Sequence, residues 1–267
     1  MSDALDRLEA RAEVLKLARV LGVEPQSLTY LHDVASADIR RLREQATDTL
    51  FDANLGALRR MATASKLLPA GPLASIAEKA FGPLLSARMA GIVDAGRGVE
   101  IASRLSTGFL ADVAAELDPR RAAHIITKLP AATVTEVSAV LRVREDWITL
   151  GRFVGQVPDE IAATGLSVLD DVALLRVAFL LEDKGRAGVL FGTLPDERHA
   201  GIVTAAFEHD LFHALFDLLV RLDADTHERL ALVAAALPAE VRATAADEAS
   251  DLGLLDDLGP IRDALLT

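Results

Sequence analysis

The amino-acid sequence predicts an all-α protein: an irregular right-handed stack of helical hairpins with an extra helical segment at its N-terminus. Aromatic residues make up only 4% of the 267 residues, and β-branched residues are scattered rather than set in the alternating runs that strands need. Strong helix formers such as alanine and leucine are abundant instead. A ten-residue repeat recurs from residue 97 onward, which indicates hairpins that bury one face against their neighbours.

Residues 1–66 are expected to form an N-terminal helical segment. Residues 3–22 place leucines at helical spacing, and Gly22 closes that helix. Pro25 is expected to start a short helix. A long helix is then expected from Ser36 to about Ala64.

Residues 67–96 are expected to be a Gly/Pro-rich junction of short, tightly packed helices. An alternative is contact with a membrane surface or a lipid through residues 67–89, although this stretch holds few cations. Its apolar side chains are crowded together: Leu67, Leu68, Leu73, Ile76, Phe81, Leu84 and Leu85. No run of about 18 uncharged apolar residues occurs, so no membrane-spanning helix is expected.

Residues 97–267 are expected to be a domain of helical-hairpin repeats. Three copies of the repeat align without gaps: RAAHIITKLP at 121–130, RAGVLFGTLP at 186–195 and RLALVAAALP at 229–238. Weaker copies are RGVEIASRLS at 97–106 and TLGRFVGQVP at 149–158. Each clear copy follows an apolar helix and an acidic turn, and acids suit a helix N-terminus. The closing proline either ends one helix or starts the next.

The segment LADVAAELDPRRAAHIITKLPAATVTEVSAVL, residues 110–141, resembles hairpins in the intracellular N-terminal domain of MgtE-type magnesium transporters and, more loosely, of flagellar rotor switch proteins. Weaker similarity extends over residues 97–242. The resemblance implies an α-superhelix with a packing or sensing role. In the transporters this domain precedes paired CBS modules, with which it holds magnesium, and a membrane channel. This chain has neither part, so no metal ligand is carried over to its residues.

Composition excludes several kinds of chemistry. The chain has no cysteine, which excludes disulfides, thiolate metal sites and cysteine nucleophiles. The formal net charge of −12 argues against nucleic acid as a partner. No phosphate-binding loop, nucleophile elbow or dinucleotide motif occurs, so neither an enzyme nor a cofactor is expected. The first residues alternate acids and bases without a secretory apolar core, so a cytoplasmic location is expected.

A helix-turn-helix frame at Leu17–Leu31 keeps a DNA-binding regulator as an alternative. Ala18 falls where the two helices would cross, Gly22 at the turn and Leu28 in the second helix. An ordinary helical corner would use the same residues. The side chains offered to base edges would be Gln26, Ser27, Thr29, Tyr30 and His32. Those offered to phosphates would be Arg19, Arg40, Arg41 and Arg43.

A possible metal site lies in EHDLFHALFD. His209, His213 and Asp217 are spaced to share one helical face, where they could meet zinc or another divalent ion. A metal-dependent hydrolase centred on the two histidines follows as a hypothesis. A solvated face of a helix whose other side is apolar is the alternative.

Arginines recur at one position of the repeat. Arg121, Arg186 and Arg229 begin the three clear copies. A shared structural role, such as bonding the acids or carbonyls of the preceding turn, is expected of them. A ladder that binds anionic ligands is the alternative.

The predicted function is a non-catalytic helical-repeat module for protein interaction or regulation, with a response to a divalent cation as a further expectation. A protein partner is expected, and nucleic acid is not. The DNA-binding regulator and the membrane-associated protein remain alternatives. No catalytic, cofactor-binding or metal-binding residue is assigned from the sequence.

Overall fold

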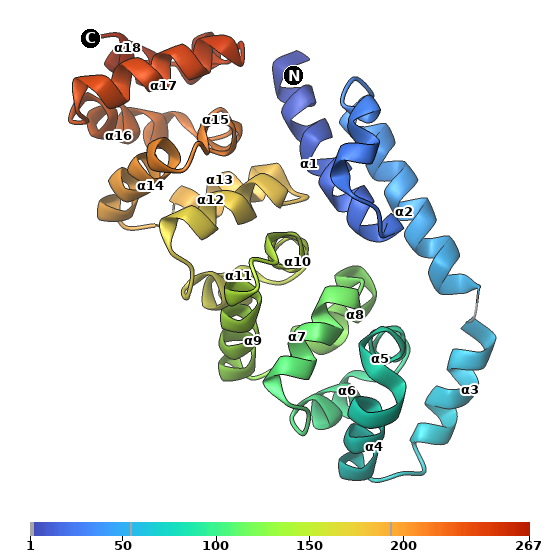
Figure 1. Ribbon diagram of the computed structural model, residues 1–267. Coiled ribbons are helices and arrows are strands. Elements are labelled where there is room, and N and C mark those ends of the chain that lie inside the picture. The colour runs from blue at the N-terminus through green and yellow to red at the C-terminus, as the bar shows by residue number, and fades with distance from the viewer. Residues whose placement is uncertain (1–2, 54, 193) are drawn as a thin grey trace. The chain divides into compact units, whose positions relative to one another are not determined.

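The structure, a computed structural model, describes residues 3–53, 55–192 and 194–267, and every regular element in them is a helix (Figure 1). The predicted all-α class is therefore confirmed. The chain divides into two compact units. The first unit comprises residues 1–43 and 170–267, and the second unit comprises residues 44–169. This division does not follow the segment boundaries at 66 and 96 that the sequence suggests.

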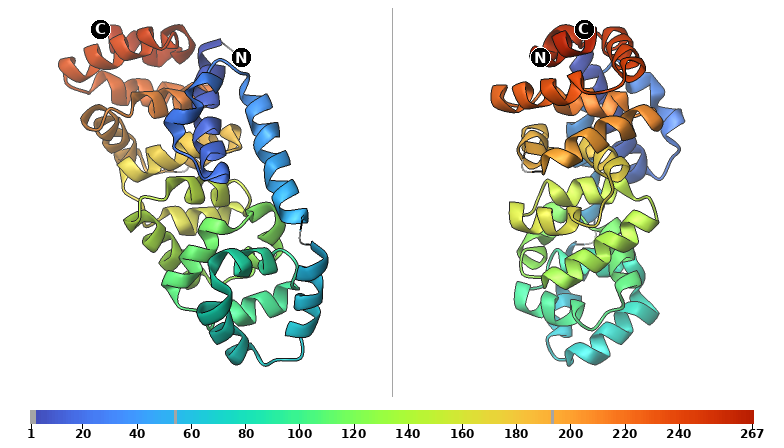
Figure 2. Two further views of the ribbon diagram at one scale, coloured as in Figure 1. Left: turned by 45° about the vertical axis from the view of Figure 1, so that its right-hand side comes forward. Right: turned by 90° about the vertical axis from the view of Figure 1, so that its left-hand side faces the viewer.

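The second unit is a stack of short helices in two rows. After the C-terminal part of α2 (Ser36–Asp52), its elements are α3 (Leu55–Ser65), α4 (Ala70–Ile76), the π-helix η2 (Ala77–Phe81), α5 (Gly82–Ala90), α6 (Ala95–Ala102), α7 (Thr107–Glu116), α8 (Pro119–Ile126), α9 (Ala131–Val143), α10 (Trp147–Val154) and α11 (Asp159–Leu166). One row is α5, α7, α9 and α11, each packed on the next, and the other is α4, α6 and α8. Figure 2 shows these helices stacked one on another.

The first unit combines the N-terminal helices with the last hairpins. Its elements are α1 (Asp3–Leu21), the 3-10 helix η1 (Pro25–Leu31), the start of α2, α12 (Asp171–Leu180), α13 (Lys184–Gly192), α14 (Asp196–Glu208), α15 (Phe212–Leu219), α16 (Ala224–Ala235), α17 (Ala239–Asp251), the 3-10 helix η3 (Leu255–Leu258) and α18 (Pro260–Leu266). Helix α1 contacts α12 and α15, so the N-terminal helix packs on the late hairpins.

Each ten-residue repeat lies in the second helix of a hairpin, and the residue that closes the repeat starts the next helix. The prolines at these N-cap positions are Pro130, Pro158, Pro195 and Pro238. In the proline-less copy Ser106 takes this position, and its hydroxyl accepts a hydrogen bond from the Phe109 backbone N–H at 3.4 Å. The proline thus begins a helix rather than ending one. Residue 193 of the repeat at 186–195 lies outside the described residues.

The acidic turns before the repeats are helix caps. Aspartates begin the second helix of five hairpins: Asp94, Asp118, Asp146, Asp183 and Asp223. The carboxylate of each accepts a hydrogen bond from a backbone N–H two or three residues further on. Such a bond satisfies a donor that the helix leaves unpaired, and the negative charge suits the positive end of the helix dipole.

Buried ion pairs hold α1 in the first unit. Glu13 is only 1% exposed, and its carboxylate accepts hydrogen bonds from Lys16 Nζ at 2.6 Å and Arg43 Nε at 3.0 Å. Arg43 also pairs with Glu182 at 2.9 Å, which joins α2 to the segment before α13. Burial by itself would raise the pKa of Glu13, but the charges of Lys16 and Arg43 outweigh it and lower that pKa to about 2.

A second group of ion pairs joins α1 to α15. Arg221 Nη2 lies 2.8 Å from Glu9 Oε1 and 3.0 Å from Asp217 Oδ1. The other Asp217 oxygen accepts a hydrogen bond from Lys184 Nζ at 2.6 Å. Burial lowers the pKa of Lys184, and Asp217 opposes that effect. The N-terminal helices therefore belong to the first unit through charged as well as apolar contacts.

Two helices predicted in the N-terminal segment can be compared with the structure. The expected helix from Ser36 to Ala64 is wrong, because α2 ends at Asp52 and α3 begins at Leu55. Aspartate, which occupies position 52, competes for backbone hydrogen bonds and favours turns. The helix expected at residues 3–22 is confirmed as α1, which Gly22 follows with φ of +67°.

Candidate functional site

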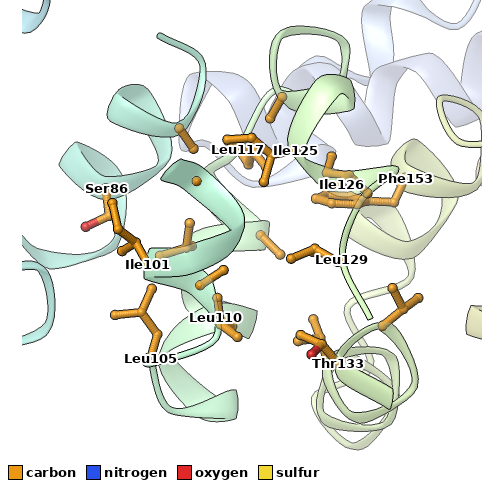
Figure 3. Close-up of a pocket in the computed structure, with 18 of the residues that line it drawn as sticks. Ser86, Ile101, Leu105, Leu110, Leu117, Ile125, Ile126, Leu129, Thr133 and Phe153 are labelled. Atoms are coloured by element: carbon orange, nitrogen blue, oxygen red, sulfur yellow. The ribbon is translucent and has the colours of Figure 1, made fainter. Parts of the chain in front are cut away.

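A partly open cavity of about 190 Å³ lies in the second unit (Figure 3). Side chains of both rows and of α10 line it. Protein interiors are packed as densely as organic crystals and contain few voids larger than a water molecule. A space of this size is therefore more than an ordinary packing defect.

Each repeat lines the cavity with the same face of its helix. In the three copies that lie in the second unit, the second, fifth, sixth and ninth residues line it. These residues are Gly98, Ile101, Ala102 and Leu105, then Ala122, Ile125, Ile126 and Leu129, then Leu150, Phe153, Val154 and Val157. This spacing is that of one face of an α-helix. These four repeat positions thus form much of the cavity wall.

The lining is apolar, and none of its described residues carries a charge. Its hydroxyl-bearing residues are Ser65, Ser86, Thr133 and Ser138. The Ser86 hydroxyl is buried and has no hydrogen-bond partner among the described residues. In Figure 3, Ser86 and Thr133 lie on opposite sides of the cavity, with Leu110 and Leu129 between them. An ionised group would lose its hydration in this lining without a partner, which disfavours charged ligands.

An apolar ligand in this cavity would make van der Waals contacts with the lining and would remove apolar surface from water. The cavity is therefore the strongest candidate for a binding site in the described part of the chain.

Two consecutive helices do occupy Leu17–Leu31, but their geometry and contacts differ from those of a DNA-binding helix-turn-helix. The second helix is η1, a 3-10 helix of seven residues in which Leu28 is buried. Gln26, Ser27, Thr29 and Tyr30 are exposed. Of the arginines expected at phosphates, Arg40 and Arg43 instead donate hydrogen bonds to buried Glu13 at 3.2 and 3.0 Å, and Arg41 pairs with Asp38. The geometry favours a packed helical corner.

The expected shared helical face of His209, His213 and Asp217 is wrong. Helix α14 ends at Glu208, and α15 begins only at Phe212, after a turn in which Asp210 has φ of +55°. Asp217 is buried in its ion pairs, and the His213 ring packs edge-on against Phe179 with centroids 4.9 Å apart. Burial lowers the pKa of His213. Within the described residues, no three His, Asp or Glu side chains lie close enough to hold a metal ion.

Arg121 has a structural contact within the second unit. Its guanidinium lies 2.8 Å from Asp48 and 3.9 Å above the ring centre of Phe51, both on α2. It also lies 3.8 Å from Asp118, the acid of the preceding turn, as expected. Burial opposes ionisation of Asp118, but hydrogen bonds and charge from Arg120 keep its pKa below the usual value.

Arg229 and Arg186 each have a contact near the start of their own helix. Arg229 lies 3.4 Å from Thr226 of its own helix, and the backbone N–H of Arg186 donates to Asp183. The element that recurs in structure is the capping aspartate, because its contact is local to each hairpin. An anion-binding ladder of arginines stays a prediction.

The apolar residues of the segment 67–89 divide between the surface and the interior. Leu67 is 86% exposed, and Leu68 and Leu84 are also exposed. Leu73 and Phe81 instead line the cavity. Within the described residues no helix combines the length and the apolar character needed to cross a bilayer.

Sequence reasoning singles out the repeats but misses the cavity. The sequence feature that could have indicated a cavity is the helical face formed by the second, fifth, sixth and ninth repeat residues, which are all small or apolar. That face is equally consistent with a filled core. Indeed, in the first unit its counterparts Ala187, Phe191, Leu230 and Ala234 are buried.

Comparison with known proteins adds no relative: no family model matches the chain, and neither a curated protein nor a solved structure is significantly similar to it. The likeness to the N-terminal domain of the magnesium transporters stays a prediction.

Proposed function

We propose that this protein is a non-catalytic helical-repeat regulatory module that binds a small, uncharged, apolar ligand inside its second unit. The observation that carries the proposal is the cavity itself. Three successive repeats turn the same apolar face toward it, and no charged side chain is found among its described lining residues.

The volume limits the size of the bound ligand. An engineered apolar cavity of about 150 Å³ stays dry and binds benzene. The cavity of this protein, at about 190 Å³, is somewhat larger. It would therefore accommodate a single aromatic ring with a substituent, or an aliphatic chain of similar bulk.

Ligand binding would be the event to which the predicted regulatory module responds. A molecule that binds the folded second unit stabilises it by mass action and favours the conformations to which it binds best. A partner protein that recognises the outer faces of the same helices would sense that change. The divalent-cation response has no comparable support, because no described cluster of ligands favours it.

The test compares 1-octanol with octanoate as probes for the full-length chain. We expect 1-octanol to bind with a stoichiometry of one, measured by titration calorimetry and by a saturable rise in melting temperature. Octanoate should bind at least about tenfold more weakly, since its carboxylate finds no cation in the lining. Absence of saturable octanol binding would contradict the proposal.

A matched pair of variants locates the site. Ala114 lines the cavity from α7, whereas the next residue, Ala115, does not. Ala114→Leu should fill part of the cavity and weaken octanol binding by about tenfold or more. Ala115→Leu should leave the binding unchanged. Equal binding by both variants would place the octanol elsewhere.

A further inference from the structure

The turn between α3 and α4 presents apolar side chains to solvent in a fixed position. Lys66, Leu67, Leu68 and Pro69 are all exposed, and Leu67 is 86% exposed. The guanidinium of Arg97 donates hydrogen bonds to the backbone carbonyls of Ser65, at 3.3 Å, and of Leu68. The turn is therefore tied to α6. Figure 1 shows it at the extreme end of the second unit, with no other helix of that unit covering it.

The stretch of sequence that contains this turn is basic in an otherwise acidic chain. Residues 53–93 contain five lysines and arginines and one acid, Glu78, whereas the whole chain carries a net charge of −12. The Glu78 carboxylate is already engaged, because it accepts hydrogen bonds from the Ser106 N–H at 2.7 Å and hydroxyl at 2.8 Å. Arg59 and Arg60 are exposed on α3.

The exposed charges and leucines lie along one side of α3. Arg59, Arg60 and Thr63 are exposed at helical spacing, and Leu67 continues that spacing just beyond the end of the helix at Ser65. A cationic helical face that leads into exposed leucines is the pattern by which proteins bind the surface of an anionic membrane. Each cation gains from the negative surface potential, and the leucines enter the boundary with the acyl chains.

We infer that the turn Lys66–Pro69, together with Arg59 and Arg60, docks on an anionic lipid surface. Ser65, which precedes this turn, and Leu73, in the helix α4 that follows it, both line the cavity. The docked protein would thus have its cavity next to a reservoir of membrane-dissolved apolar molecules. This last step rests on the proposed ligand binding, whereas the docking itself does not.

Vesicle sedimentation tests the inference with the full-length protein. We expect it to pellet with vesicles containing phosphatidylglycerol but not with pure phosphatidylcholine, and to be released by salt. The double variant Leu67→Ser, Leu68→Ser should lower the partition coefficient by about tenfold or more, because it removes the inserted apolar area. Val143→Ser is the control, since Val143 is 74% exposed on α9 in the same unit.

The outcomes separate the two proposals. A protein that stays in the supernatant with every vesicle would overturn the docking, and so would a double variant that pellets like the wild type. A dimer in solution that the double variant breaks, without vesicle binding, would instead assign the patch to a second copy of the chain. Octanol binding measured without vesicles should be the same in all these variants, so it tests the cavity independently.

Discussion

At the scale of single residues, Glu13 has an unusual environment for a carboxylate. It is almost fully buried, and it is surrounded by Lys16, Arg40 and Arg43. The desolvation of a buried ion is repaid only when its hydrogen bonds are complete, which is the case for both Glu13 oxygens. Removing one partner of such a cluster leaves uncompensated charge, so the stability of the first unit depends strongly on Glu13 ionisation.

This dependence predicts a loss of stability in acid. The folded pKa of Glu13 is about 2, below its ordinary value of 4.5. Its contribution is therefore complete above about pH 4.5 and is lost as the pH falls toward 2; at about 1.4 kcal/mol per pKa unit it amounts to roughly 3 kcal/mol. Urea unfolding of the wild type between pH 6 and pH 3 should show a decline in the free energy of unfolding that is steeper than in Glu13→Gln. Parallel pH profiles of the two proteins would contradict the assignment.

The sequence predicts the local polar contacts but not this cluster. The capping aspartates follow from the sequence because the bond partner of each lies two or three residues away. Glu13 and Lys16, in contrast, are three residues apart and look like an exposed helical ion pair. Their burial depends on Arg43 and on Glu182, which is 169 positions from Glu13 and reaches the cluster through Arg43. No local pattern contains that information.

At the scale of helices, the close approach of α6 and α8 shapes the cavity wall. A Cβ added at Gly98 would lie 2.3 Å from Ile125 Cδ1 and 2.7 Å from Cγ1, so only glycine fits there without a shift. A Cβ added at Gly96, on the same helix, would meet only the side chain of Asp94, whose Oδ1 would lie 3.9 Å away. Alanine substitutions at these two positions therefore distinguish the effect of close packing, at Gly98, from the effect of helix propensity, at Gly96.

Gly98→Ala should destabilise the second unit by about 1–3 kcal/mol, the usual range for overpacking. The displaced Ile125 side chain borders the cavity and should also weaken octanol binding. Gly96→Ala should stabilise by roughly 0.5–1 kcal/mol through helix propensity and leave binding intact. Urea unfolding and calorimetry of both variants provide the check. An equally stable Gly98→Ala would show that α6 and α8 are not in such close contact.

Helix boundaries were predictable where glycine or proline marks them. Gly22 and the prolines that start α9, α11, α14 and α17 are examples. The break between α14 and α15 has no such marker: the chain turns at Asp210, a non-glycine residue with positive φ. The spacing of His209 and His213 suggested one helical face for that reason, and the turn separates them.

At the scale of the whole chain, the repeats could be predicted from sequence and the division into units could not. The first unit joins residues 1–43 to residues 170–267, so its boundary falls in the middle of the repeat series. Repeats on both sides of that boundary share the same apolar face. Whether that face is filled or encloses a cavity depends on the fit between side chains of opposite rows, which the pattern does not specify.

Ligand binding should therefore protect only one of the two units. Octanol at about 100 times its dissociation constant adds roughly 2.7 kcal/mol to the stability of the structure that binds it. Hydrogen exchange followed by mass spectrometry should then slow for amides of α4 to α11, whose side chains line the cavity, and stay unchanged in α14 to α18. Protection confined to α14 to α18 would mean that the apolar ligand binds in the first unit and that the cavity stays empty. Uniform slowing in both units would show instead that occupancy of the cavity is transmitted along the chain, the behaviour expected of a regulatory module whose signal is read far from its ligand.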